Sequence, residues 1–111
     1  MKIKIFQINR DRDTKHVVFL ALKSTLRMNG ESTVDPSIYD KVFEGDVKCR
    51  DLEDVYMMFN DNLPSGYTGR SLSVSDVVQV LESDTMKQGC FFCDAIGFEE
   101  IPSEFATQVA G

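Results

Sequence analysis

A strong helix signal between residues 51 and 60 most narrowly limits the folds open to this chain. The apolar side chains there recur at i, i+3, i+4 and i+7, so they share one side of a helix. The stripe consists of Leu52, Val55, Tyr56 and Phe59. Asp51 is positioned to cap the first turn, and the acids that follow favour the positive end of the helix dipole. A helix with one apolar face must rest on a second layer, and the rest of the chain has to supply it.

Short segments rich in β-branched and aromatic residues supply that layer. Lys2 to Ile8 alternates, with Ile3, Ile5 and Gln7 on one face, and the further candidate strands are 16–21, 38–44, 75–81, 89–94 and 97–101. The first two are joined by a short charged turn, which predicts an opening antiparallel hairpin. A short helix is expected over about 23–29, with Gly30 as its stop.

These elements predict an α+β fold. We expect a single domain with a mostly antiparallel sheet of five or six short strands, packed by the main helix and the short one. The domain spans residues 1–101, and residues 102–111 form a loosely ordered tail.

The charge of the chain is unevenly distributed. Residues 1–50 hold ten basic and seven acidic side chains, whereas residues 51–111 hold two basic and eleven acidic ones, for a net charge of −6. An acidic surface argues against direct nucleic-acid binding, which needs clustered Lys and Arg, and it suits a basic protein partner. Lysines interrupt the apolar residues of the N-terminus, and no apolar run approaches a membrane span. We therefore expect a cytoplasmic protein.

Reactive side chains are few. Cys90 and Cys93 are spaced as C-x-x-C, but the two phenylalanines between them indicate a strand, on which positions i and i+3 face opposite ways. Ser71, Ser73 and Ser75 alternate with apolar residues along one strand face, and the only histidine, His16, is expected within an apolar strand. We therefore expect no catalytic residue, no cofactor and no metal site.

Arg70 is the arginine that stands alone in the acidic half. It either contacts a partner through its planar guanidinium or acts as an ion-paired anchor near Asp76 or Asp94, and we favour the anchor. If Met57 is exposed on the main helix, it would form a partner patch with Tyr67 and Leu63; packing in the core is the default alternative. The candidate interaction residues are Arg70, Tyr67, Met57, Glu53, Asp54, Glu82 and Asp84.

Four blocks of sequence occur in a characteristic order. They are IKIFQINRDRD, IYDKVFEGDV, LEDVYMMFN, and YTGRSLSVSDVVQV followed by FFCDAIGFEEI, together spanning roughly residues 2–101. In this combination the chain resembles the YodL-like domain family, small bacterial domains that recur in proteins of conjugative elements and phages. The family has no established catalytic residues, so the resemblance implies none here.

The resemblance and the charge pattern together predict a function by binding. We expect a non-catalytic macromolecular interaction module, an accessory protein of a bacterial mobile element. One alternative is an acidic mimic of nucleic acid that inhibits a restriction or CRISPR effector. The second alternative is an enzyme of unknown type.

Overall fold

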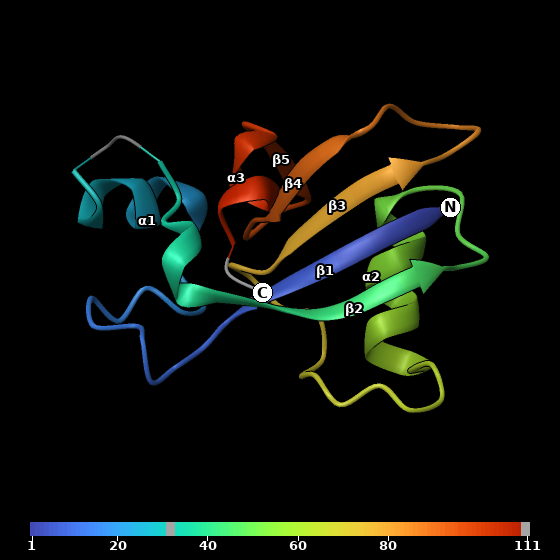
Figure 1. Cartoon of the computed structure of the whole chain (residues 1–111), viewed down its shortest axis with the longest axis horizontal. Helices are drawn as coiled ribbons and strands as arrows, with labels where there is room; N and C mark the ends of the chain where they lie inside the picture. The colour runs from blue at the N-terminus through green and yellow to red at the C-terminus, as the bar shows by residue number, and fades with distance from the viewer. Residues whose placement is uncertain (31–32, 110–111) are drawn as a thin grey trace.

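The computed structural model describes residues 1–30 and 33–109 and confirms the α+β class. Its elements, in chain order, are β1 (Lys2–Ile8), α1 (Leu22–Met28), the 3-10 turn η1 (Pro36–Ile38), β2 (Tyr39–Asp46), α2 (Leu52–Asp61), β3 (Val77–Glu82), β4 (Gly89–Cys93), β5 (Phe98–Ile101) and α3 (Glu104–Gln108) (Figure 1). The five strands form one antiparallel sheet in the order β2-β1-β3-β4-β5.

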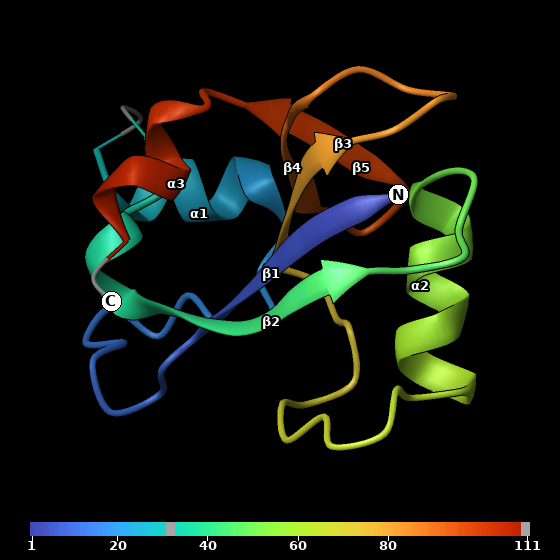
Figure 2. The same ribbon diagram turned by 45° about the vertical axis from the view of Figure 1, so that its right-hand side comes forward.

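The sheet is covered on both faces. α2 lies against one face, and α1 and α3 lie against the other (Figure 2). β1 serves both cores because its side chains alternate: Ile3 and Ile5 pack toward α2, whereas Phe6 and Ile8 pack toward α1 and α3. Strands that are buried on both faces need apolar residues at nearly every position, which explains the continuous apolar runs in β3 and β4.

The main helix forms where it was predicted. Asp51 is its N-cap, and its carboxylate accepts a hydrogen bond from Asp54 N at 2.9 Å. Val55 and Phe59 are fully buried against the sheet. The ring of Phe59 also meets Phe43 of β2 edge to face, with centroids 5.0 Å apart.

The prediction of a strand over residues 16–21 is wrong. His16 and Phe19 have left-handed backbones, with φ of 56° and 68°. The buried carboxylate of Asp13 accepts hydrogen bonds from Val17 N and Val18 N, both at 2.9 Å. These amides would otherwise be free to join a sheet, so the side chain has replaced the β-ladder. β1 therefore pairs with β2 and β3 instead of forming an opening hairpin.

The C-terminal segment also differs from the loosely ordered tail that we expected. Residues 104–108 form α3, and Phe105 is buried in the core beneath it. Its ring meets Tyr39 and Phe6 edge to face, with centroids 4.9 and 5.6 Å away. One aromatic anchor thus docks a helix too short to be stable alone. Residues 110–111 lie outside the described part of the chain.

The short helix is confirmed as α1. Gly30 ends it with φ 76°, a left-handed conformation that glycine adopts without strain. The first amide of the helix, Leu22 N, donates to Asp94 Oδ1 at 3.1 Å, so a residue from the β4–β5 turn caps α1.

Candidate functional site

The loop from Tyr67 to Asp76 connects α2 to β3 and is fastened to the sheet by Gln7. The Gln7 amide nitrogen donates to Arg70 O at 2.9 Å and to Asp76 Oδ2 at 3.0 Å, and its oxygen accepts from Arg70 N at 3.0 Å. Gln7 is buried at the end of β1, where a polar side chain needs such partners. The amide therefore fixes the position of Arg70 in the loop.

Asp76 is the buried titratable group of this network. Its side chain is 1 % exposed, and Oδ2 accepts from Gln7 and from Ser73 N, the latter at 2.8 Å. Oδ1 has no hydrogen-bond partner within the described residues. Burial raises the pKa of Asp76 to about 7, against hydrogen bonds that favour the charged form. The group therefore changes charge near neutral pH.

Two tyrosines complete the attachment of the loop. Tyr67 donates its hydroxyl to Arg70 O at 2.7 Å, and its ring packs 5.2 Å from that of Phe59. Tyr39 donates to Ser75 O at 2.6 Å. Burial raises the pKa of both, to about 12 for Tyr67, so both hydroxyls stay protonated donors. Gly69 allows this close approach, because a Cβ there would lie 2.4 Å from the Tyr67 hydroxyl.

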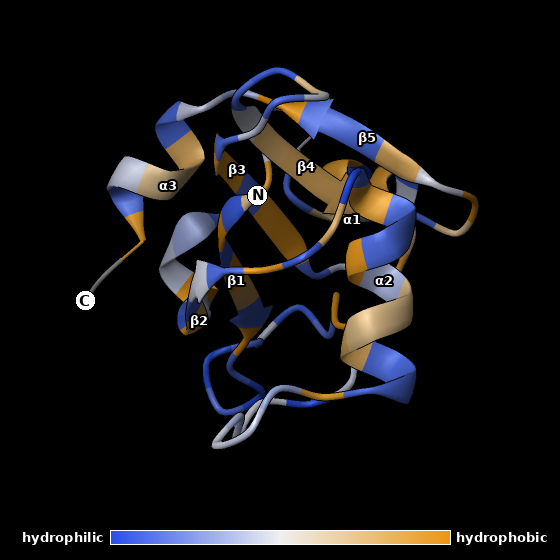
Figure 3. Ribbon diagram, turned by 90° about the vertical axis from the view of Figure 1, so that its right-hand side faces the viewer, coloured by the Kyte–Doolittle hydropathy of each residue, from blue (hydrophilic) through white to orange (hydrophobic). Residues whose placement is uncertain are grey.

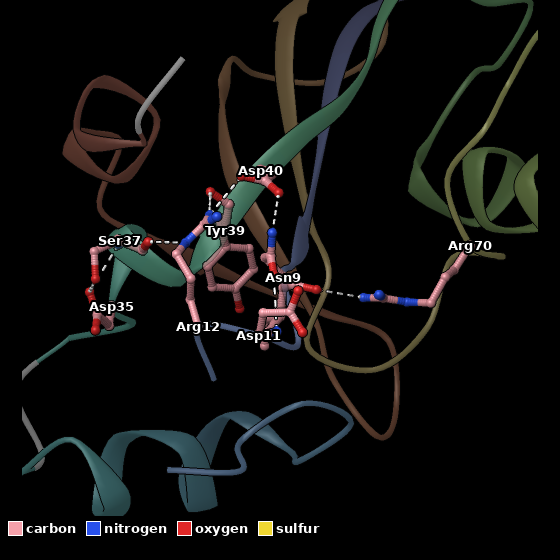
Figure 4. Close-up of polar contacts among 9 residues, drawn as sticks. Asn9, Asp11, Arg12, Asp35, Ser37, Tyr39, Asp40 and Arg70 are labelled. Carbon is pink, nitrogen blue, oxygen red and sulfur yellow. Dashed lines mark hydrogen bonds and ion pairs between the residues drawn. The ribbon is translucent and has the colours of Figure 1, made fainter. Parts of the chain in front are cut away.

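The side chain of Arg70 reaches back to β1. Its Nη2 donates to Ile8 O at 3.0 Å, as the close-up in Figure 4 shows. Its Cζ lies 5.9 Å from the centroid of the Phe19 ring, and the Cζ of Arg10 lies at the same distance from that ring. Arg70 thus links the loop to β1, but the ion pair expected with Asp76 or Asp94 is absent within the described part of the chain. The carboxylate of Asp76 accepts from Gln7 and Ser73 N, and that of Asp94 accepts from Leu22 N and Ala95 N.

A shallow groove of about 360 Å³ runs beside this anchor. It lies between the end of β1, the start of β2 and the loop at 68–70, and we call it the Arg10–Arg70 groove. Its lining is Gln7, Ile8, Asn9, Arg10, Asp11, Asp40, Val42, Thr68, Gly69 and Arg70.

A second surface lies where α2 meets the turn between β4 and β5. A groove of about 180 Å³ separates Glu53 and Tyr56 of the helix from Ala95 and Gly97 of the turn. Between these two turn residues stands Ile96, which is 93 % exposed. Figure 3 shows the hydrophobic segment at the tip of this turn. We call Glu53, Tyr56, Met57 and residues 95–97 the α2–turn surface.

The predicted interaction residues fall into separate places. Glu53 and Met57 are exposed on the α2–turn surface, with Met57 61 % exposed. Asp54 is paired with Arg50, whose N and Nε donate to Asp54 Oδ2 at 3.0 and 3.1 Å. Glu82 and Asp84 are exposed at the far end of β3. Tyr67 is half-buried, with its ring against Phe59 and its hydroxyl on Arg70 O.

The remaining candidate reactive side chains, two cysteines and a serine, take part in packing or in hydrogen bonds to the backbone. Cys90 packs in the core under α1 and α3, and Cys93 lines the groove beside α2, so the two face opposite sides of β4. Burial raises the pKa of both thiols, that of Cys93 to about 12. Ser75 does not belong to a strand: it has φ 86° and accepts from Phe19 N at 3.0 Å.

Within residues 1–30 and 33–109, no three His, Cys, Asp or Glu side chains gather as a metal site would require. None of the helices in these ranges has the length and hydrophobicity needed to cross a bilayer.

The geometry defines a small α+β domain in which the polar residues of the loop hold backbone in place. The family model of the YodL-like domain matches residues 2–105, so the chain belongs to that family, as its resemblance predicted. No curated protein and no solved structure matches the chain significantly.

Sequence reasoning missed Gln7, Phe19 and Ile96 as parts of these sites. Gln7 stands among apolar residues of β1, and a polar side chain facing a core has to find partners. Ile96 lies in a four-residue turn between two strands, where an isoleucine has no core to enter. Phe19 gave no signal, because its role depends on a left-handed backbone.

Proposed function

We propose that this domain is a non-catalytic binding module that recognises a basic protein partner through the α2–turn surface. The observation that supports it most is the exposure of Ile96, at 93 %, in the turn that lines one groove with the exposed Tyr56. Apolar groups grouped at a rim of polar residues are typical of binding surfaces, whereas single exposed ones need no explanation.

The charge around this surface specifies the partner. Glu53 lies on the helix side and Asp94 begins the turn, both within the acidic half of the chain. Of the two cations of that half, Lys87 is paired with Glu100 at 2.7 Å, and Arg70 lies in the other groove, where it donates to Ile8 O. An apolar centre with an acidic rim fits a segment that carries an apolar anchor flanked by Lys or Arg.

The setting that we propose is cytoplasmic, in a bacterial mobile element, as the family resemblance implies. The structure gives the candidate reactive groups other uses: the thiols of Cys90 and Cys93 are buried with raised pKa values, and the Ser75 hydroxyl accepts a hydrogen bond from Phe19 N. These uses support a binding role over a catalytic one.

Site-specific photocrosslinking tests this function. A photoreactive amino acid at position 96 should crosslink the partner in host cells, whereas the same group at the exposed Met28 of α1 should not. With the purified partner, Ile96→Ser should weaken binding about tenfold or more, because truncating a central anchor typically costs over 1 kcal/mol. Met28→Ser is the matched control and should bind like the wild type.

The outcomes separate the candidate functions. A nucleic-acid mimic would bind a basic nuclease in a strongly salt-dependent way, would weaken on charge reversal at Glu82 or Asp84, and would tolerate Ile96→Ser. Equal crosslinking from positions 28 and 96, or unchanged affinity in Ile96→Ser, would refute the α2–turn surface as the binding site.

A further inference from the structure

We infer that the Arg10–Arg70 groove binds a small phosphate-bearing ligand. This site is separate from the α2–turn surface and does not depend on the function proposed for it. The inference starts from two arginines, sixty positions apart in the sequence, that converge on one ring and line one groove.

Both guanidiniums keep hydrogen-bonding capacity unused. The guanidinium of Arg10 makes no hydrogen bond or ion pair with the residues that the structure describes. That of Arg70 donates one bond, from Nη2 to Ile8 O, and its Nη groups have no second acceptor in the same part of the chain. Each Cζ is 5.9 Å from the Phe19 centroid, so the two lie at most about 12 Å apart. A polyvalent anion in the groove that both arginines line would satisfy free donors and reduce the repulsion of two like charges.

Phe19 preorganises the two arginine side chains for ligand binding. Its ring is 47 % exposed, and its backbone is held at φ 68° with the N–H donating to the buried Ser75 hydroxyl at 3.0 Å. A left-handed backbone is costly for an aromatic residue, and here the surrounding structure imposes it. The ring face attracts guanidinium groups and restricts their rotation, so less side-chain entropy is lost when a ligand binds.

The rest of the groove adds donors. The backbone N–H groups of Thr68 and Gly69, and the Thr68 hydroxyl, have no acceptor within residues 1–30 and 33–109. Of the two carboxylates present, Asp40 is already engaged: Arg12 donates to one oxygen at 2.6 Å and Asn9 to the other at 3.0 Å. These bonds, first that from Arg12, hold the pKa of Asp40 below its usual value. Asp11 is the one acidic side chain of the groove that stays unpaired in the described structure.

The chemistry of the lining selects a phosphate group on a small molecule. Planar guanidiniums match phosphate oxygens in a paired geometry, and backbone N–H groups in loops commonly complete such sites. A nucleic acid would extend beyond the groove onto a chain whose net charge is −6, where it would be repelled. A compact ligand meets only the local donors.

Titration with inorganic pyrophosphate, followed by amide and arginine Nε resonances at constant ionic strength, tests this inference. The expected result is saturable shifts confined to residues 7–11, 19 and 68–70. Arg10→Gln should weaken binding at least about tenfold, since a charge-assisted hydrogen bond is lost. Asp11→Asn should tighten it, because a like charge leaves the groove. Arg27→Gln, at an exposed arginine of α1, is the matched control and should change nothing.

Three results would overturn the inference. Equal shifts from chloride at matched ionic strength would show screening alone. Unchanged affinity in Arg10→Gln, with the fold intact by the amide spectrum, would remove the arginine pair. Tighter binding of a single-stranded oligonucleotide than of pyrophosphate would replace the small ligand by nucleic acid.

Discussion

Replacing Asp76 by asparagine removes a buried charge while keeping the shape of the side chain. In the wild type, Oδ2 accepts from Gln7 and Ser73 N, and Oδ1 has no partner in the described part of the chain. An asparagine oxygen can take over both accepted bonds. Its NH2 group then occupies the position of Oδ1, where a buried unsatisfied donor costs about 1–3 kcal/mol.

The size of the pH effect on the unfolding free energy follows from the pKa of Asp76, which rises from 3.8 to about 7 on folding. A carboxyl group whose pKa is raised stabilises the fold when protonated, so this contribution is complete below pH 3.8 and is lost as the pH rises to about 7. A rise of roughly 3 pKa units corresponds to about 4 kcal/mol, of which roughly 2–3 kcal/mol is lost between pH 5 and pH 8. At pH 7 about half of the folded molecules still carry this proton, so the contribution becomes constant only above about pH 8.

Urea unfolding, followed by far-UV circular dichroism at pH 5, 6, 7 and 8, measures the effect. The wild type should lose about 2–3 kcal/mol of unfolding free energy across this range, whereas Asp76→Asn should be nearly flat and more stable than the wild type at pH 8. His16→Gln is the control, since it removes the only histidine and leaves Asp76 in place. A wild type whose stability is constant or rises from pH 5 to 8, or an Asp76→Asn variant with the same slope, would refute the reasoning.

Three further predictions concern α3, the loop and the thiols. Phe105→Ala should cost about 3–5 kcal/mol in urea unfolding, as for buried aromatics elsewhere, and a loss under 1 kcal/mol would contradict the docking of α3. Gly69→Ala should destabilise the fold because its Cβ would lie 2.4 Å from the Tyr67 hydroxyl and 2.6 Å from Cζ of the same ring, and in the double variant with Tyr67→Ala, which lacks both atoms, the total loss should be smaller than the sum of the single losses; additive effects of the two changes would exclude that clash. Cys90 and Cys93 should react with a thiol reagent only on unfolding, whereas the half-buried Cys49 should react faster; prompt labelling of all three would contradict their burial.

Local signals predicted the parts of this fold that local interactions decide. The helix α2 has a cap, an acidic first turn and an apolar stripe within ten residues, and the β4–β5 hairpin is bounded by glycines. The pairing of β1 with β3 joins segments more than seventy positions apart, and no local pattern specifies it. Residues 16–21 were mispredicted because their β-branched composition was overruled by the carboxylate of Asp13, four and five positions before the amides that it binds.

The sites were less predictable than the fold for a related reason. The sequence shows that Arg70 is the lone arginine of the acidic half. It does not indicate its partners, Ile8 O and the Phe19 ring, which come from the first twenty residues of the chain. An ion pair with Asp76 was expected from proximity in sequence, whereas Gln7 links Asp76 to the Arg70 backbone instead. A hydrogen bond between a side chain and a distant backbone carbonyl produces no residue spacing in the sequence from which it could be predicted.

The loop at 67–76 touches both proposed surfaces, which gives its distinctive sequence a physical reason. Its first part, at 68–70, lines the Arg10–Arg70 groove, and Val74 lines the groove beside α2. Gln7 and Asp76 hold the loop to the sheet, and ionised Asp76 attracts the positive charge of Arg70. Ionisation of Asp76 therefore adds a negative charge close to the groove, which opposes the binding of an anion. Ligand affinity in the Arg10–Arg70 groove should fall less between pH 6 and pH 8 in Asp76→Asn than in the wild type. The same pH dependence in both would mean that the charge of Asp76 does not act on a ligand in this groove.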